Sequence, residues 1–343
     1  MEQLSEIKKR IKSVNDIKQM TRAMQLISAV KMRRARSQLE QTMPFFALCA
    51  ESIIELREAN IVIDNRFFQL RQKKKGETWK IGYFVLTGDQ GLAGAYNLNV
   101  LATAEQHIRY KQVDNVRKGM MTTAKLYVCG SIGKDRLIRE GFDVDETFRY
   151  PINEPTYYRA RDISDYIYDL YENGTLDLVY AIYTKIESAI SMKPMVTRML
   201  PVNPDALEEL VPPKYGRQRA LISGAAVEYA PSVDDVANYL INTYLNGMVY
   251  GILTEAYASE QTARMTAMDN ATDNATDMQA QLTLKNNQAR QGRITRELTE
   301  IVGGAEVLAE LKAEMAASGQ AGPVSGKGDE TTKRCRFPDS VLL

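Results

Sequence analysis

The chain has 343 residues, of which 44% are hydrophobic and 25% are charged, and its formal net charge is +1. This composition is ordinary for a soluble protein, and the near-zero net charge excludes a strong overall attraction to nucleic acid or to a membrane. Three isolated cysteines (Cys49, Cys129 and Cys335) and one histidine (His107) supply neither a disulfide framework nor a zinc knuckle.

Membrane insertion is not expected from the sequence. No apolar run approaches the roughly 18 residues that a membrane-spanning helix needs. Charged residues also interrupt the N-terminal region where a signal peptide would carry an apolar stretch. We therefore expect a cytoplasmic protein without direct membrane insertion.

The first segment, residues 1–70, is expected to be mainly helical. Between Met1 and Arg36 it carries ten Lys or Arg against three acids. Its apolar residues alternate three and four positions apart, which predicts a seam that packs along a partner helix in a coiled coil. The predicted seam residues are Leu4, Ile7, Ile11, Val14, Ile17, Met20, Met24 and Ile27. The helix is expected to run past Ala35 and to resume after Pro44.

A domain of alternating strands and helices is predicted within residues 71–230. The expected strands are 79–87, 125–130, 176–184 and 193–201, and the expected helices are 97–110, 132–140 and 159–171. Loop composition is concentrated in residues 203–224.

A second long helix is predicted for residues 231–311. Ser232 is a suitable N-cap, Asp234 and Asp235 favour the first turn, and neither Gly nor Pro occurs from Ile252 to Gln291. It is the one segment long enough to pair with the N-terminal seam. The predicted fold is therefore an α/β domain plus a long antiparallel coiled coil of the N- and C-terminal helices, and residues 312–343 form a flexible tail by composition.

The glycine-rich segment "GDQGLAGAYN" (residues 88–97) follows a predicted strand and precedes a helix, as phosphate-binding loops do. Its spacing is G-x-x-G-x-x-G and no Gly-Lys-Ser/Thr follows, so a tight strand-to-helix turn is the default and a nucleotide site the alternative. Two further hypotheses stay open: the basic helix could follow nucleic-acid phosphates, and Asp269, Asp273 and Asp277 could hold a cation instead of forming an exposed acidic stripe.

Groups of residues that could form a catalytic or metal-binding site are otherwise scarce. The sequence offers no Ser/His/Asp set and no cluster with metal-ligand spacing, so we expect no catalytic site, no cofactor and no metal. Cys335 lies between Arg334 and Arg336, which would favour its thiolate, although an accidental exposed cysteine is the alternative.

Three segments carry a resemblance to a known family. They are "IKSVNDIKQMTRAMQLISAVKM" (residues 11–32), "GDQGLAGAYN", and the stretch from "ASEQTARMTAMDNATDNA" to "RQGRITRELTEIVGGA" (residues 258–305). Together they resemble the gamma subunit of the rotary ATP synthase. The resemblance implies a rotor shaft, not itself catalytic, that turns inside a hexamer of alpha and beta subunits and couples proton or sodium flow to ATP synthesis. Its implied partners are those subunits, the epsilon subunit and the membrane proteolipid ring, with no nucleic acid, on the cytoplasmic face of the bacterial inner membrane.

The resemblance also assigns residues. Met24 and Arg264 correspond to coupling positions at one level of the shaft. Arg290, Gln291, Thr295 and Glu297 correspond to the upper segment that contacts the beta subunits. Tyr229 corresponds to a foot residue near the proteolipid ring, although Ala230 follows it where the family often has an acid. The tail also departs from the family, whose members commonly end soon after "EIVGGA".

Overall fold

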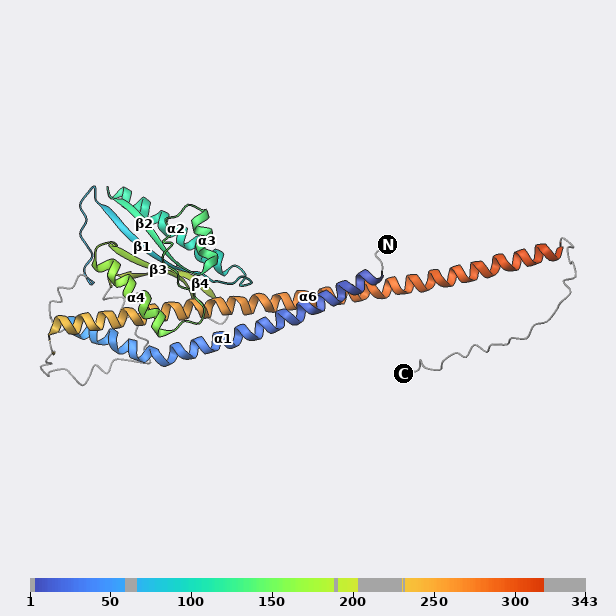
Figure 1. Ribbon diagram of the computed structural model, residues 1–343, viewed down its shortest axis with the longest axis horizontal. Coiled ribbons are helices and arrows are strands. Elements are labelled where there is room, and N and C mark those ends of the chain that lie inside the picture. The colour runs from blue at the N-terminus through green and yellow to red at the C-terminus, as the bar shows by residue number, and fades with distance from the viewer. Residues whose placement is uncertain (1–3, 59–66, 188–190, 203–229, 231, 318–343) are drawn as a thin grey trace. The chain divides into compact units, whose positions relative to one another are not determined.

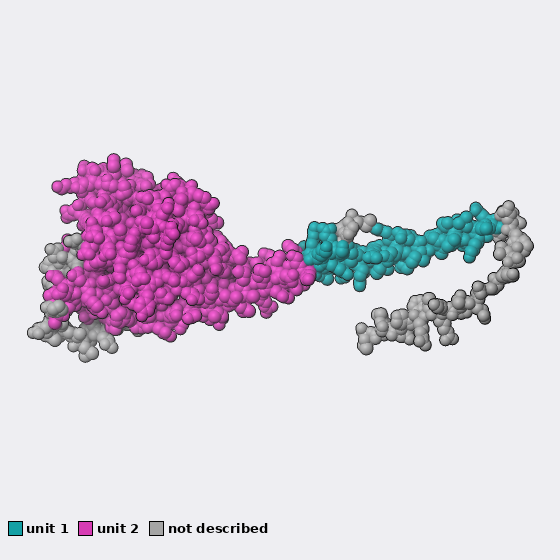
Figure 2. All heavy atoms as spheres, in the orientation of Figure 1, with its two compact units in different colours: residues 1–11, 280–343 teal, residues 12–279 magenta. Residues whose placement is uncertain are grey.

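A computed structural model describes residues 4–58, 67–187, 191–202, 230 and 232–317. The chain divides into two compact units, one of residues 12–279 and the other of residues 1–11 and 280–343 (Figure 2). Tyr229, Cys335, Arg334 and Arg336 lie outside the described residues.

Helices and strands follow the predicted order along the chain (Figure 1). The elements are α1 (Leu4–Glu58), β1 (Thr78–Leu86), α2 (Tyr96–Arg117), β2 (Met121–Cys129), α3 (Ser131–Arg139), α4 (Tyr157–Glu172), β3 (Leu178–Ile186), β4 (Met192–Leu200) and α6 (Val233–Ala317). Several predicted boundaries are wrong. β2 begins at Met121 rather than at residue 125, and α2 ends at Arg117 rather than at residue 110. α1 continues through Pro44 instead of resuming after it, and α6 extends six residues into the segment predicted as a flexible tail.

Within the described residues, the four strands form one mixed sheet with the order β2-β1-β3-β4. β1 pairs in parallel with both β2 and β3, whereas β4 pairs antiparallel with β3 at the edge. The carboxyl ends of β1 and β2 therefore lie at the same edge, and the glycine-rich segment after β1 starts there.

Both faces of the sheet are covered, and successive side chains of β1 point to opposite faces. Ile81, Tyr83 and Val85 pack with α2 and α3 in one buried cluster. Phe84 and Leu86 face the opposite cluster, which contains residues of α4, of the last turns of α1 and of the first turns of α6, up to Ala256. The long helices are thus anchored in the core of the α/β domain.

Asp145 secures the segment that covers the outer edge of β2. Its backbone N–H donates to the carbonyl of Leu126 at 2.8 Å. Its carboxylate accepts hydrogen bonds from the Thr147 hydroxyl at 2.5 Å and from the Phe148 N–H at 3.2 Å, and it pairs with the Lys125 ammonium at 3.1 Å. Burial alone would raise the pKa of Asp145, but the bonds from Thr147 and Lys125 outweigh it and lower the pKa to about 2.

Acid should therefore weaken the fold through Asp145. A lowered folded-state pKa contributes stability that is complete above the ordinary value of 3.8 and is lost as the pH falls toward about 2. Urea unfolding of Asp145→Asn should show a smaller loss of stability between pH 5 and pH 2.5 than the wild type shows. Asp165→Asn, an exposed carboxylate on α4, is the control. Equal pH slopes for wild type and Asp145→Asn would contradict this assignment.

In the unit of residues 12–279, α1 and α6 lie side by side and antiparallel (Figure 1). The hydroxyls of Thr21 and Thr272 are 2.8 Å apart, and Gln25 Nε2 donates to Asp269 Oδ1 at 2.8 Å. Further along α1, a Cβ on Gly247 would meet the Phe46 ring at 2.1 Å. Along these contacts the residue number rises in α1, from Thr21 to Phe46, and falls in α6, from Thr272 to Gly247. The two helices therefore run antiparallel.

In its first 32 residues, 4–35, α1 buries residues at a strict seven-residue repeat. The buried positions there are Ile7, Val14, Thr21, Ser28 and Ala35. Of the predicted seam residues, Ile7 and Val14 are buried, and Leu4 and Ile11 are half-buried. The prediction is wrong at Ile17, Met20 and Ile27. Beyond Val14, up to Ala35, the buried positions of α1 keep their seven-residue spacing, but the apolar residues of the sequence no longer fall on them. Small and polar residues such as Thr21, Ser28 and Ala35 are buried there instead. Ile17, Met20 and Ile27 are exposed, and Met24 is half-buried.

Candidate functional site

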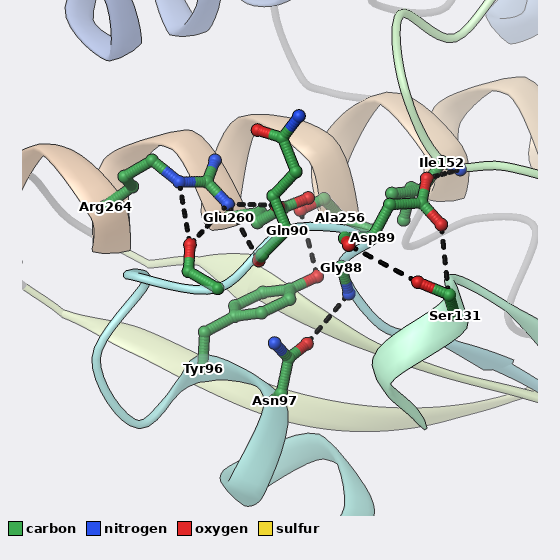
Figure 3. Close-up of polar contacts among 11 residues, drawn as sticks. Gly88, Asp89, Gln90, Tyr96, Asn97, Ser131, Ile152, Ala256, Glu260 and Arg264 are labelled. Carbon is green, nitrogen blue, oxygen red and sulfur yellow. Dashed lines mark hydrogen bonds and ion pairs between the residues drawn. The ribbon is translucent and has the colours of Figure 1, made fainter. Parts of the chain in front are cut away.

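The candidate site is the junction between the glycine-rich segment and α6 (Figure 3). Arg264 reaches from α6 to the backbone of that segment. Its Nη2 donates to the carbonyl of Gln90 at 3.0 Å, and its Nε and Nη2 each donate to the carbonyl of Gly91 at 3.2 Å. The guanidinium thus joins two segments that are separated by more than 170 residues of sequence.

Glu260 lies one helical turn before Arg264 and pairs with it. We call the contacts of Arg264 with Glu260 and with the Gln90 and Gly91 carbonyls the clamp. The two side chains form an ion pair at 2.5 Å, with only 6% of the Arg264 side chain and 2% of the Glu260 side chain exposed. Burial is the largest influence on the pKa of Glu260 and raises it, while Arg264 acts in the opposite direction. The Glu260 Oε2 atom is buried and has no hydrogen-bond partner among the residues that the structure describes. Removing Arg264 would therefore leave a buried carboxyl without its counter-charge.

Gly88 allows the strand end to pass close to Glu260. A Cβ at this position would lie 2.8 Å from the Glu260 carboxyl carbon and from one of its oxygens. The Gly88 N–H donates to Asn97 Oδ1 at 2.7 Å, which ties the start of the segment to the first turn of α2. The Tyr96 hydroxyl donates to the Ala256 carbonyl on α6 at 3.1 Å.

Asp89 extends the same network to two other parts of the domain. Its carboxylate accepts hydrogen bonds from the N–H groups of Ser131 and Ile152, each at 3.0 Å. The Ser131 hydroxyl donates in turn to the Asp89 carbonyl at 3.3 Å. The segment after β1 is therefore fixed to α6, α2, α3 and the loop before α4 at once.

This geometry favours the structural interpretation of the glycine-rich segment over a nucleotide site. A phosphate cradle directs backbone N–H groups toward an anion. Here the Gln90 and Gly91 carbonyls face a cation, and a carboxylate lies against Gly88. Gly88 serves close approach of the backbone to α6 rather than contact with phosphate.

The residues assigned by resemblance fall into two groups. Met24, half-buried, and Arg264, buried, belong to the unit of residues 12–279. Arg290, Gln291, Thr295 and Glu297 are exposed on α6 in the other unit. Glu297 accepts a hydrogen bond from Arg293 at 2.7 Å. The Arg264 side chain contacts the backbone of this same chain, at the Gln90 and Gly91 carbonyls.

Glu260 and Asp89 were not among the predicted site residues. A signal for Glu260 was present, because an acid four residues before Arg264 lies on the same helix face and can pair with it. Asp89 carried no comparable signal, since its partners come from distant segments.

Other candidate chemistry can be placed as well. Asp269, Asp273 and Asp277 are exposed, and Asp269 pairs with Gln25. In the described part of the chain, no group of three or more His, Cys, Asp or Glu is arranged to hold a metal ion. None of the described helices combines the length and the apolar character that crossing a membrane requires.

Comparison with known proteins connects this architecture to one family. The ATP synthase family model matches residues 3–308. The ATP synthase gamma chain of Ruminiclostridium cellulolyticum is 42% identical over 305 residues, covering 89% of this chain and 98% of the relative. That of Acetivibrio thermocellus is 37% identical over 308 residues, covering 90% and 100%.

A solved structure shares the fold. A chain in the cryo-EM structure of the Euglena gracilis mitochondrial ATP synthase (OSCP/F1/c-ring, rotational state 3) matches with a TM-score of 0.54 at 15% identity. The match covers 95% of this chain and 98% of that chain. On the family model and the relatives together, the chain belongs to the family of ATP synthase gamma chains.

Proposed function

We propose that this chain is the central shaft of a rotary ATP synthase and carries torque without an active site of its own. The observation that supports this most is the antiparallel pairing of α1 with α6, whose contacts include the polar pairs Thr21–Thr272 and Gln25–Asp269. A pair of helices held in this way can turn as one body while it presents an irregular outer surface.

The paired helices form an antiparallel coiled coil in this proposal. The seven-residue burial repeat of α1 supports it, and α6 has a matching series of buried or half-buried residues. That series is Gln261, Met265, Met268, Thr272, Ala275 and Gln279, which are three and four positions apart. Such alternation is the spacing of a left-handed supercoil. Ile17, Met20 and Ile27 then face outward, toward surrounding subunits.

The clamp gives the shaft its connection to the α/β domain. Torque applied to that domain reaches α6 through the buried contacts of Arg264, Glu260 and Tyr96 with the segment after β1. Several short, buried bonds resist shear better than one exposed ion pair, because water does not compete for them.

The partners follow from this role. The shaft turns inside a hexamer of alpha and beta subunits, and the α/β domain contacts the epsilon subunit and the membrane proteolipid ring at the cytoplasmic face of the bacterial inner membrane. Met24, Arg264, Arg290, Gln291, Thr295 and Glu297 are the proposed coupling positions, and Tyr229 is the proposed foot contact. Proton or sodium flow through the ring drives the rotation.

Reconstitution tests the proposed function directly. Alpha and beta subunits from the same genome should show ATP hydrolysis that rises at least about tenfold when the full chain is added and co-purifies with them. Equal activity with and without the chain, or no co-purification, would exclude the shaft role.

A charge introduced at Met24 should disturb coupling. In membranes carrying the whole complex, Met24→Lys should keep ATP hydrolysis but lower ion-driven ATP synthesis several-fold, because a cation at a half-buried position of the shaft would hold passing acidic groups. Met121→Lys, at an exposed position of β2, serves as the control. If both variants synthesise ATP at the same rate, Met24 is not a coupling residue.

A further inference from the structure

The strand β3 continues beyond its pairing with β1. The parallel pairs between the two strands end at Val85 and Ile182, whereas β3 runs to Ile186. On the other side β3 stays paired with β4 to its end, although Pro194, opposite Thr184, has no N–H to donate. The backbone of β3 beyond Ile182 therefore needs other partners on the side that β1 has left.

Two side chains of α6 bond this end of β3. Ser259 Oγ donates to the carbonyl of Thr184 at 2.8 Å, and Glu255 Oε1 accepts a hydrogen bond from the N–H of Ile186 at 2.8 Å. Ser259 is fully buried and Glu255 is half-buried. Glu255 and Ser259 are four residues apart and therefore share one face of α6. We call these two hydrogen bonds the strand-end anchor.

The strand-end anchor and the clamp hold α6 from different sides. Glu260 and Arg264 also lie four residues apart and share a face. Because each residue turns an α-helix by about 100°, the step from Glu255 to Glu260 places the clamp face about 140° around α6 from the anchor face. Contacts on one face alone would let α6 roll about its own axis, whereas contacts on two faces fix its rotational setting.

We propose that Glu255 and Ser259 are positioning residues that, together with the clamp, prevent α6 from rolling against the sheet. This inference rests on the proposed function and deepens it, because a shaft transmits torque only if its helix cannot roll where it is attached. The clamp joins α6 to the segment after β1, and the strand-end anchor joins it to β3. Without the anchor, rolling of α6 would absorb part of each turn of the α/β domain.

The test uses the full chain in its complex with alpha and beta subunits and a probe attached at Tyr110→Cys on α2. In the absence of ATP, the angular spread of the probe measures the torsional stiffness between the α/β domain and the hexamer. The double variant Glu255→Leu/Ser259→Ala should lower this stiffness about twofold, because satisfied buried hydrogen bonds rigidify the elements that they join.

Two further variants separate stiffness from stability. Glu255→Gln keeps an oxygen that accepts from the Ile186 N–H, so it should keep the wild-type stiffness. Ile108→Val, in the buried cluster that contains α2, should lower the stability of the domain but leave the stiffness unchanged, because it does not touch the strand-end anchor. Urea unfolding of the isolated chains measures the stability of each variant.

The inference is overturned if the double variant has the stiffness of the wild type. It is also overturned if Ile108→Val or Glu255→Gln loses as much stiffness as the double variant, because the effect would then not come from the two hydrogen bonds. A wild-type chain that does not join the complex, or whose probe does not turn during ATP hydrolysis, would instead reject the proposed function itself.

Discussion

Replacing Arg264 with alanine should lower the free energy of unfolding of the chain by about 3–5 kcal/mol, because it leaves Glu260 buried without its counter-charge. The same change removes the donor to the Gln90 and Gly91 carbonyls. Urea denaturation followed by circular dichroism measures the loss.

A matched control exists on the same helix. Arg293 and Glu297 form an ion pair of the same i, i+4 spacing at 2.7 Å, but their side chains are 69% and 54% exposed. Arg293→Ala should leave the unfolding midpoint unchanged within error. The two pairs share residue types and spacing, whereas only Arg264 is buried and donates to the Gln90 and Gly91 carbonyls, so the comparison isolates the buried clamp. Equal losses in Arg264→Ala and Arg293→Ala would contradict the clamp.

A double variant separates stability from torque transmission. Glu260→Leu/Arg264→Met removes both charges and should recover much of the stability lost in Arg264→Ala. It cannot restore the hydrogen bonds to the segment after β1. In the complex it should therefore stall at a lower opposing torque than the wild type. A wild-type stall torque would show that the clamp does not carry load.

Alanine at Gly247 and at Gly251 should change stability in opposite directions. The two glycines are one turn apart on α6, and in both cases alanine gains roughly 1 kcal/mol in helix propensity. At Gly247 an added Cβ would meet three atoms of the Phe46 ring at 2.1–2.6 Å, so α1 and α6 would have to separate. Overpacking of this kind costs about 1–3 kcal/mol.

Gly251 offers open space instead. Apart from the neighbouring residues and backbone of α6 itself, no described atom lies within 4 Å of a Cβ built there, and the residue lines a groove of about 190 Å³. Gly251→Ala should therefore raise the unfolding midpoint, whereas Gly247→Ala should lower it and weaken the packing of Phe46 against Tyr250. If both variants are stabilised, α1 and α6 are not in close contact at Phe46.

The sequence was sufficient to predict the order of the elements, because hydrophobic residues recur with one spacing in the strands of the α/β domain and with another in its helices. It was not sufficient for the helix seam. The prediction followed the most hydrophobic residues to Ile17 and Met20, but seven-residue geometry buries Thr21 and Ser28 instead. When more than one side of a helix is apolar, the apolar residues alone do not show which side packs against another helix of the same chain.

The clamp was beyond local pattern analysis for a different reason. Arg264 was singled out by resemblance as a coupling position, and the resemblance gave no sign that its side chain is buried against Gln90, Gly91 and Glu260. Only the folded chain brings these segments together. The end of α6 was also missed, because the composition of residues 312–343 indicated a flexible tail, whereas the helix continues to Ala317.

Rotation of this chain against its surrounding subunits is the most direct test of the central claim. A probe attached at Tyr110→Cys, an exposed position of α2, should turn in one direction while the complex hydrolyses ATP. It should turn equally well when a disulfide between Thr21→Cys and Thr272→Cys joins α1 to α6, because both helices move as one body. A probe that stays still while the complex hydrolyses ATP at its full rate would contradict the account.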